Sequence, residues 1–199
     1  MAVTLADIKK LRDMTGAGMM DVKKALEEAN GDFEVAKDLL RKRGQAIAAK
    51  RSDREASEGC VLAKIDGTFG AIIALKCETD FVANNADFVK LTQDILDLAI
   101  ANKCKTLEEV KALPMGAGDV AQAVVDRSGI TGEKMELDGY CCIEAENIAT
   151  YNHMNRNGLC TMLALNKAVE DPTVGKNIAM QIASAAPVAI DESGVAQSV

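Results

Sequence analysis

Apolar residues recur every three or four positions near the amino terminus, and this period predicts a series of short amphipathic helices. The first helix covers residues 4–13 and begins at Thr4–Asp7, a variant of the capping box. The second covers residues 21–28, and the third begins after a cap at Asp32 and ends at Gly44. The residues expected to face one small core are Leu5, Ile8, Leu11, Val22, Ala25, Leu26, Phe33, Ala36, Leu39 and Leu40.

Two adjacent methionines follow the first predicted helix. Thr15–Gly18 breaks the helical pattern, and Met19 and Met20 come next in the same loop. A short loop cannot bury both thioethers, and the flexible, polarizable Met side chain suits an exposed apolar contact. The alternative is that one or both methionines fill the core of the bundle. Three short helices with such a loop predict a docking module, and a ubiquitin-binding module is the first rival hypothesis.

The middle of the chain shows strand patterns followed by a helix. Residues 46–58 are rich in Ala and in charge, and they predict a helical linker. Strands over residues 60–65 and 69–77 form a hairpin around an Asp-Gly turn. A long helix then opens at Asn85 or Ala86. Its inward residues are Phe88, Leu91, Ile95, Leu98 and Ala99.

Further helices and a second hairpin complete the pattern. A capping box at Thr106–Glu109 begins a helix that Pro114 ends, and another short helix ends before Gly129. Strands are predicted over residues 139–144 and 159–165, with an Asn-Gly turn before the second strand. The apolar residues of the last two helices are Val120, Ala123 and Val124, then Ile178, Ala179, Ile182 and Ala183.

The last third of the chain therefore repeats the order of the middle, a hairpin followed by a helix. Two such units can share one antiparallel sheet, with helices over one face. The predicted fold class is α+β, with an amino-terminal three-helix bundle and a core of two related hairpin-plus-helix subdomains. The predicted domains are residues 1–45 for the docking bundle, 46–58 for the linker, 59–138 for core subdomain N and 139–199 for core subdomain C.

Charge is unevenly distributed along the chain. Residues 1–54 hold 12 Lys and Arg against 9 Asp and Glu, whereas the whole chain has a net charge of −7. An acidic body with only 3% aromatic residues argues against direct nucleic-acid binding, although two solvated surfaces of different composition explain the asymmetry equally well. No apolar run approaches the ~20 residues of a membrane span, and the amino terminus has no signal core. We therefore expect a cytoplasmic protein with no membrane partner.

Candidate catalytic and metal-binding chemistry is sparse. The chain has six cysteines and one histidine, with no Cys-x-x-Cys pair, so no zinc site and no cofactor are expected. Cys60, Cys77 and Cys160 lie in apolar strand patterns, where Cys acts as a small hydrophobe. His153 is expected in an exposed turn between two strands. A thiol enzyme that pairs a cysteine with His153 is the second rival hypothesis.

The constellation of most interest is the segment from Thr79 to Val82. It joins the end of a buried strand to the start of a long helix, a place where binding residues tend to lie. If Phe81 is exposed, it forms an apolar plug beside the carboxylate of Asp80. The alternative is that Phe81 packs under the following helix.

Three motifs, in order along the chain, resemble the elongation factor Ts family. The first runs from Ile8 to Leu26 (IKKLR, then TGAGMMDVKKAL), the second from Ala48 to Gly59, and the third is CETDFVA at Cys77–Ala83. A weaker similarity at His153 and residues 178–183 extends the resemblance over nearly the whole chain. The resemblance implies a ubiquitin-associated-like bundle followed by two related α+β subdomains.

The same resemblance implies a function and a set of contact residues. Members are guanine-nucleotide exchange factors of the GTPase elongation factor Tu, in its GDP-bound and nucleotide-free states, and perform no covalent chemistry. It implies that Asp80 and Phe81, flanked by Thr79 and Val82, intrude beside the Mg²⁺ site of the GTPase. The implied docking residues are Arg12, Met19, Met20 and Lys23 in the bundle, and His153, Lys176 and Asn177 in the second subdomain.

The chain also departs from the family pattern. The usual Ile-Gly-Glu-Asn segment is replaced by Ile130-Thr131-Gly132-Glu133-Lys134, so Ile130 and Gly132 stand where the family has a contact. Many longer members continue with a helical protrusion and a closing carboxy-terminal segment. A fragment of a longer protein is therefore one interpretation of this chain, and a homodimer is expected only of the full-length protein.

Overall fold

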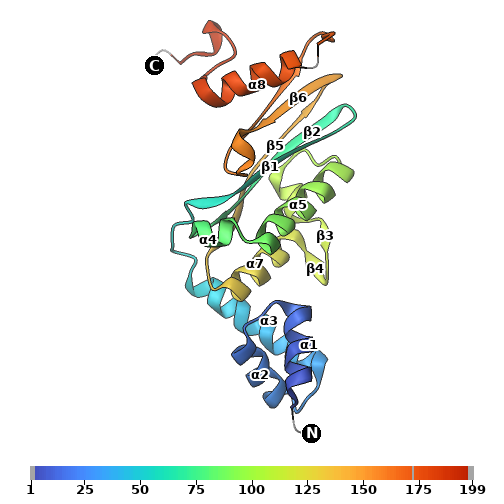
Figure 1. The fold of residues 1–199 in the computed structure, drawn as a ribbon, viewed down its shortest axis with the longest axis vertical. Helices are drawn as coiled ribbons and strands as arrows, with labels where there is room; N and C mark the ends of the chain where they lie inside the picture. Colours follow the sequence, from blue (N-terminus) through green and yellow to red (C-terminus); the bar gives the residue numbers. More distant parts are fainter. Residues whose placement is uncertain (1–2, 172, 197–199) are drawn as a thin grey trace. The chain divides into compact units, whose positions relative to one another are not determined.

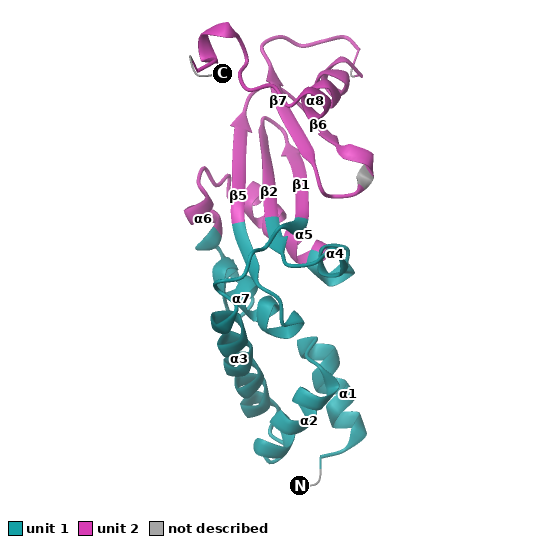
Figure 2. Cartoon of the chain, turned by 90° about the vertical axis from the view of Figure 1, so that its left-hand side faces the viewer, with its two compact units in different colours: residues 1–59, 75–88, 111–137 teal, residues 60–74, 89–110, 138–199 magenta. Residues whose placement is uncertain are grey.

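The computed structural model describes residues 3–171 and 173–196 and shows an α+β protein, as the sequence predicts (Figure 1). The ends of the predicted terminal domains, residues 1–2 and 197–199, lie outside the described residues. The domain boundaries predicted at residues 45, 58 and 138 stay a prediction. The chain forms two compact units (Figure 2), of which unit 1 comprises Met1–Gly59, Leu75–Phe88 and Lys111–Leu137, and unit 2 comprises Cys60–Ala74, Val89–Val110 and Asp138–Val199.

Unit 1 begins with the predicted helical bundle of α1 (Leu5–Thr15), α2 (Met19–Glu28) and α3 (Phe33–Lys50). The capping box of Thr4 and Asp7 is present at the start of α1, and Asp32 caps α3. The expected inward residues are largely confirmed, but Leu5 is 78% exposed. Six residues turn a helix by 600°, so Leu5 and Leu11 lie about 120° apart on α1 and only one of them can face the core. The fully buried core comprises Leu11, Val22, Ala25, Leu26 and Ala36.

Two glycines that were expected to end helices do not do so. The third helix passes through Gly44 to Lys50, and α7 (Val120–Thr131) passes through Gly129 to a left-handed cap at Gly132, with φ 73°. Gly44 and Gly129 instead face one another, since a Cβ atom built on Gly44 would lie 3.2 Å from the Cα of Gly129. The absence of a side chain serves close helix packing at both positions, and helix termination at neither.

A three-stranded sheet has the order β1-β2-β5, with β1 (Glu58–Asp66), β2 (Phe69–Cys77) and β5 (Met135–Glu144). The hairpin of the first two strands is confirmed, and its turn residue Gly67 has a φ of +58°. After β2 come the single turn α4 (Asp80–Ala83) and the long helix α5 (Ala86–Ala101). The remaining elements before β5 are α6 (Leu107–Lys111) and the short antiparallel pair β3 (Pro114–Met115) and β4 (Gly118–Asp119).

The second hairpin differs from the prediction. Its strands are β6 (Asn147–Asn152) and β7 (Cys160–Leu165), which pair antiparallel from Asn147↔Leu165 to Asn152↔Cys160. The strand predicted over residues 139–144 belongs to β5 and joins the first hairpin, so the two hairpins lie in separate sheets. The sequence NIATYN was missed because polar residues at both ends hide its pattern. A 3-10 turn η1 (His153–Asn155), the helix α8 (Thr173–Ala185) and a 3-10 turn η2 (Glu192–Gly194) complete the described chain.

Candidate partner-binding site

The predicted Thr79–Val82 segment forms a capped turn at the end of β2. Thr79 is extended, with φ −127° and ψ 154°, and its Oγ1 accepts a hydrogen bond from the Val82 amide at 3.4 Å. Asp80 is exposed, and Phe81 is 85% exposed. The expectation of an exposed aromatic plug beside a carboxylate is therefore favoured over a Phe81 packed under the helix.

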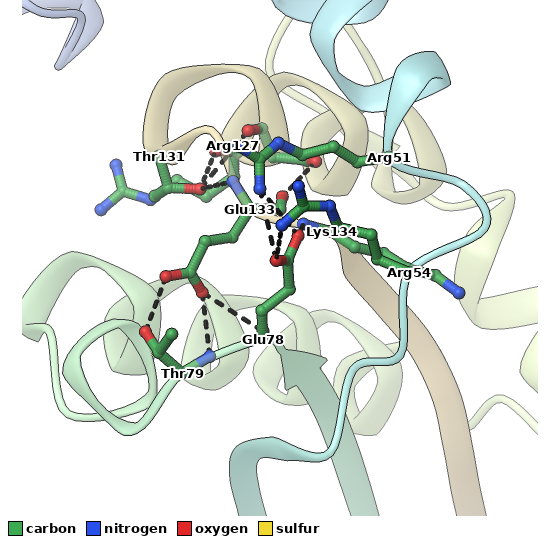
Figure 3. A network of polar contacts seen from close by, with 9 residues as sticks. Arg51, Arg54, Glu78, Thr79, Arg127, Thr131, Glu133 and Lys134 are labelled. Carbon is green, nitrogen blue, oxygen red and sulfur yellow. Dashed lines mark hydrogen bonds and ion pairs between the residues drawn. The ribbon is translucent and has the colours of Figure 1, made fainter.

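The carboxylate of Glu133, in the segment after α7, binds the start of this turn (Figure 3). Its Oε2 accepts hydrogen bonds from the backbone amides of Glu78, at 3.2 Å, and of Thr79, at 3.1 Å. Its Oε1 accepts a hydrogen bond from Thr79 Oγ1 at 2.6 Å. A single carboxylate thus binds three donors of two consecutive residues, and the next two residues are Asp80 and Phe81.

Glu78 carries a second group of polar contacts at the same place (Figure 3). Its carboxylate accepts hydrogen bonds from the Lys134 amide at 2.6 Å, from Arg51 Nη1 at 3.1 Å and from Arg54 Nη1 at 3.0 Å. The hydrogen bond from the Lys134 amide and the two guanidinium groups hold the pKa of Glu78 below its usual value. The side chain is only 13% exposed, and burial alone would raise its pKa, but these donors outweigh that effect and favour the ionised carboxylate.

The start of α5, just after the turn, is fixed by Arg127 on α7. Arg127 Nη2 donates to Asn85 Oδ1 at 3.2 Å and lies 3.0 Å from Asp87 Oδ2. The same Asn85 oxygen accepts hydrogen bonds from the backbone amides of Asp87 and Phe88, at 2.9 and 3.4 Å, and so caps the helix. Both flanks of the exposed Asp80–Phe81 pair are therefore anchored within unit 1.

The predicted docking residues of the bundle lie on α1 and α2. Met19 and Met20 are not in a loop, as the sequence predicted, but form the first turn of α2, because Gly18 is extended and acts as the N-cap. They are 50% and 64% exposed, so the alternative that they fill the core is wrong. Arg12 and Lys23 are also exposed, and Lys23 Nζ lies 3.8 Å from Glu27 Oε1. The exposed apolar side chains of Met19 and Met20 are followed along α2 by the exposed charges of Asp21 and Lys23.

Ile130 and Gly132 lie at the end of α7. Gly132 is the left-handed cap, and Ile130 is half-buried. Ile130 lines a cavity of about 630 Å³ in unit 1, together with Met14, Gly18 and Ile47. The structure thus places Ile130 beside the entry to α2, and Gly132 immediately before the Glu133 that binds the Thr79 turn.

The predicted contacts of the second subdomain lie in unit 2. His153 is exposed in the 3-10 turn between β6 and β7, as expected. Its Nδ1 lies 3.3 Å from Tyr151 Oη, and the two rings meet edge to face. Lys176 and Asn177 are exposed in α8. These residues belong to unit 2, whereas the Asp80–Phe81 turn belongs to unit 1.

The cysteines expected to act as hydrophobes are buried. Cys60, Cys77 and Cys160 are enclosed, as is Cys104, and burial raises the pKa of the Cys60 thiol to about 11. A thiol with a raised pKa is a poor nucleophile at neutral pH. Within residues 3–171 and 173–196, no three His, Cys, Asp or Glu side chains gather closely enough to hold a metal ion. Among the helices described, none combines the length and the apolar content needed to cross a membrane.

Sequence reasoning missed the residues that hold the turn. Glu78 is part of the motif at Cys77–Ala83, and Glu133 is part of the segment that departs from the family pattern, but neither was expected to act on Asp80 and Phe81. About 55 residues of chain separate them, and no local periodicity reports such a contact. Arg51 and Arg54 were assigned only to a charged linker.

Comparisons with known proteins agree on the family. A sequence model of the family Elongation factor TS matches residues 78–199. Elongation factor Ts of Bacteroides thetaiotaomicron is 70% identical over 199 residues, covering 100% of this chain and 60% of that protein. Elongation factor Ts of Porphyromonas gingivalis strain W83 is 55% identical over 191 residues, covering 96% and 69%, and that of Azobacteroides pseudotrichonymphae is 43% identical over 195 residues, covering 98% and 71%.

The similarities to these relatives extend over at least 96% of the chain and show its family. The chain belongs to the elongation factor Ts family. The chain spans 60% of the length of the Bacteroides relatives that it matches.

Proposed function

We propose that this chain is a guanine-nucleotide exchange factor for elongation factor Tu. In this proposal it binds the GTPase and promotes release of GDP by disturbing the Mg²⁺ and phosphate site, and it makes no covalent bond. The observation that carries the proposal is the 85% exposure of Phe81 on a turn anchored on both flanks. Exposed large aromatics on fixed elements are typical of interface anchors, because their burial in a partner removes apolar surface from water.

Exchange without covalent chemistry rests on linkage. A protein that binds the nucleotide-free GTPase more tightly than the GDP-bound form must weaken GDP binding by the same factor. Mg²⁺ tolerates little displacement from octahedral geometry, so a small shift of its supporting element lowers phosphate affinity. Phe81 is proposed to wedge into an apolar gap of the GTPase, and the Asp80 carboxylate to add negative charge or rearrange hydrogen bonds beside the metal.

Affinity and exchange are proposed to lie in different parts of the chain. The exposed surface of Met19 and Met20, with Arg12 and Lys23, docks on the GTPase domain and supplies affinity that offsets the strain of the open state. His153, Lys176 and Asn177 add contacts from unit 2, and Ile130 and Gly132 from the end of α7. The proposed partner is elongation factor Tu alone, without direct nucleic-acid or membrane binding, in the cytoplasm, and a homodimer is proposed only for a full-length protein.

The decisive experiment is stopped-flow release of fluorescent GDP from elongation factor Tu. The GTPase is loaded with the labelled nucleotide and mixed with increasing concentrations of this chain and an excess of unlabelled GDP. We expect the release rate to rise with the concentration of the chain and then to saturate. A release rate that stays at its spontaneous value at concentrations that saturate binding refutes the proposal, and a pull-down with ubiquitin in parallel tests the rival module.

A further inference from the structure

We propose that Glu133 is the positioning residue of the turn at Thr79–Val82: its carboxylate holds Phe81 at the angle needed to open the GTPase. The inference rests on the proposed function and adds a residue to the same site. Glu133 binds the backbone just before Asp80 and Phe81, so in this proposal it acts through that backbone.

The contacts of Glu133 are concentrated at one point of the chain. Its two oxygens bind the amides of Glu78 and Thr79 at 3.2 and 3.1 Å and the Thr79 hydroxyl at 2.6 Å. The two amides donate at the end of β2, directly before the turn. Amides bound by a carboxylate make stronger hydrogen bonds than amides bound by a neutral acceptor. The direction in which the chain leaves β2 is therefore set by this side chain.

Glu133 is itself held firmly. Its carbonyl oxygen accepts a hydrogen bond from Ser128 Oγ at 2.5 Å, and its amide donates to Thr131 Oγ1 at 3.3 Å. The next residue, Lys134, donates its amide to the Glu78 carboxylate at 2.6 Å. Glu133 and Lys134, which follow α7, thus bind the two residues that follow β2. Glu133 accepts hydrogen bonds from Glu78 and Thr79, and Lys134 donates one to Glu78 (Figure 3).

Without Glu133, part of this arrangement persists and part is lost. Thr79 keeps its role as cap for Val82, and Glu78 keeps Arg51, Arg54 and the Lys134 amide. The amides of Glu78 and Thr79 and the Thr79 hydroxyl lose the acceptor that Glu133 provides, so the turn is less constrained where the chain leaves β2. A misplacement of about 1 Å costs up to ~100-fold where a reacting group must be aligned, so loss of alignment at Phe81 should appear in the exchange rate.

The matched variants are Glu133→Ala and Glu133→Gln. Glutamine keeps one oxygen for the two amides, and its NH₂ group can donate to the Thr79 hydroxyl, whose own proton is free to rotate. The Gln variant therefore preserves the connection, whereas Ala removes it. Glu136→Ala is the control, because Glu136 is exposed on β5 and lies 3.4 Å from Lys134 Nζ but has no hydrogen bond to the turn.

The test measures GDP release at saturating concentrations of the chain, where affinity no longer matters. We expect Glu133→Ala to lower this limiting rate by about 10-fold, and Glu133→Gln and Glu136→Ala to stay within about 3-fold of the unchanged chain. In a chain that already carries Phe81→Ala, Glu133→Ala should lower the rate no further, because the residue acts through that ring. An unchanged rate for Glu133→Ala, or a full additional loss in the Phe81→Ala background, overturns the proposal.

A second measurement does not depend on exchange activity. Hydrogen exchange of the amides of residues 78–83 in the free chain should become faster in Glu133→Ala and remain near the original rate in Glu133→Gln, while α1 to α3 stay protected. Unchanged protection of residues 78–83 in the Ala variant overturns the positioning role. If the unchanged chain fails to release GDP but these amides respond as expected, the proposed function has failed and the positioning of the turn by Glu133 has not.

Discussion

Gly44 on α3 and Gly129 on α7 cross so closely that a Cβ atom built on Gly129 would lie 2.2 Å from the Cα of Gly44. The reverse distance, from a Cβ on Gly44 to the Cα of Gly129, is 3.2 Å. Because the atoms that would be met are backbone atoms, no side-chain rotation can relieve the clash. The two helices can pack at this distance only if the residue on α7 has no side chain.

Gly129→Ala should therefore destabilise unit 1 despite the better helix propensity of alanine. We expect a loss of about 1–3 kcal/mol, in the range of overpacked sites, and a smaller loss for Gly44→Ala. Chemical unfolding followed by circular dichroism measures both variants. The control is Gly158→Ala, since among the described residues, its two chain neighbours aside, no heavy atom lies within 4 Å of a Cβ at that position. Equal stability of the Gly129 and Gly158 variants would contradict the packing argument.

Phe81→Ala should separate exchange from binding. The ring is 85% exposed in the free chain, so its removal leaves the fold and the folding stability nearly unchanged. We expect the limiting rate of GDP release to fall by roughly tenfold or more, which corresponds to ~1.4 kcal/mol of lost transition-state stabilisation. Stopped-flow release gives the rate, and titration of nucleotide-free elongation factor Tu gives the affinity. A loss confined to affinity would argue against a wedge.

Met20→Ala should show the opposite division. Met20 is 64% exposed on the first turn of α2 and is proposed to dock without touching the nucleotide site. We expect complex formation to weaken by roughly tenfold, about 1.4 kcal/mol, with the limiting release rate almost unchanged. Leu5→Ala, which removes another exposed apolar side chain of the bundle, is the matched control. Equal losses in both steps for the Met20 and Phe81 variants would refute the division of labour.

Acid should weaken the network around Glu78. Its pKa is lowered in the folded chain, so its contribution to stability is fully present above the unfolded pKa of about 4.3 and is lost as the pH falls through the folded value. Glu78→Gln should therefore be less stable than the unchanged chain at pH 7, by roughly 1–3 kcal/mol for hydrogen bonds to charged groups. Unfolding at a series of pH values should show this gap closing below pH ~4. A gap that is constant with pH would show that the charge of Glu78 contributes nothing.

Thiol labelling should report burial directly. Cys141 is exposed, whereas Cys60, Cys77, Cys104 and Cys160 are buried. A maleimide at neutral pH should label Cys141 first, and the buried thiols should react only as the chain opens. Mass spectrometry after short labelling times identifies the site. Cys141→Ser should remove the fastest phase and leave slower labelling of the half-buried Cys142, and fast labelling of Cys60, Cys77, Cys104 or Cys160 would contradict the packing.

Sequence patterns predicted most of the helices because their signals are local. The capping box at Thr4, the Asp32 cap and the apolar spacing of α5 each lie within a few residues of the element that they define. For Phe81 the sequence allowed two positions, exposed or packed under the following helix, because the pattern around a single aromatic residue at a strand end is the same in both cases. Only the fold decides between them.

The features that the sequence did not reveal all depend on distant pairs. From the sequence alone, Gly44 is typical of a helix end, and only its contact with Gly129 explains why glycine is needed there. Glu133 likewise has the pattern of a loop residue, and its role follows only from the 2.6 Å distance between its carboxylate and Thr79 Oγ1. The strand at Asn147–Asn152 was missed because its first and last residues are polar and hide the apolar pattern between them. Tertiary contact decides each of these cases.

The central place of β2 in its sheet has a mechanical consequence. A ring that must displace part of another folded protein will itself be pushed back unless its own support is the stiffer of the two. An edge strand could bend or separate under that reaction force. In contrast, β2 is hydrogen-bonded to a strand on each side, and Phe81 lies just beyond the end of β2. Under the proposed function, deformation on docking should therefore fall on the GTPase, and this chain should leave the complex in the shape in which it entered.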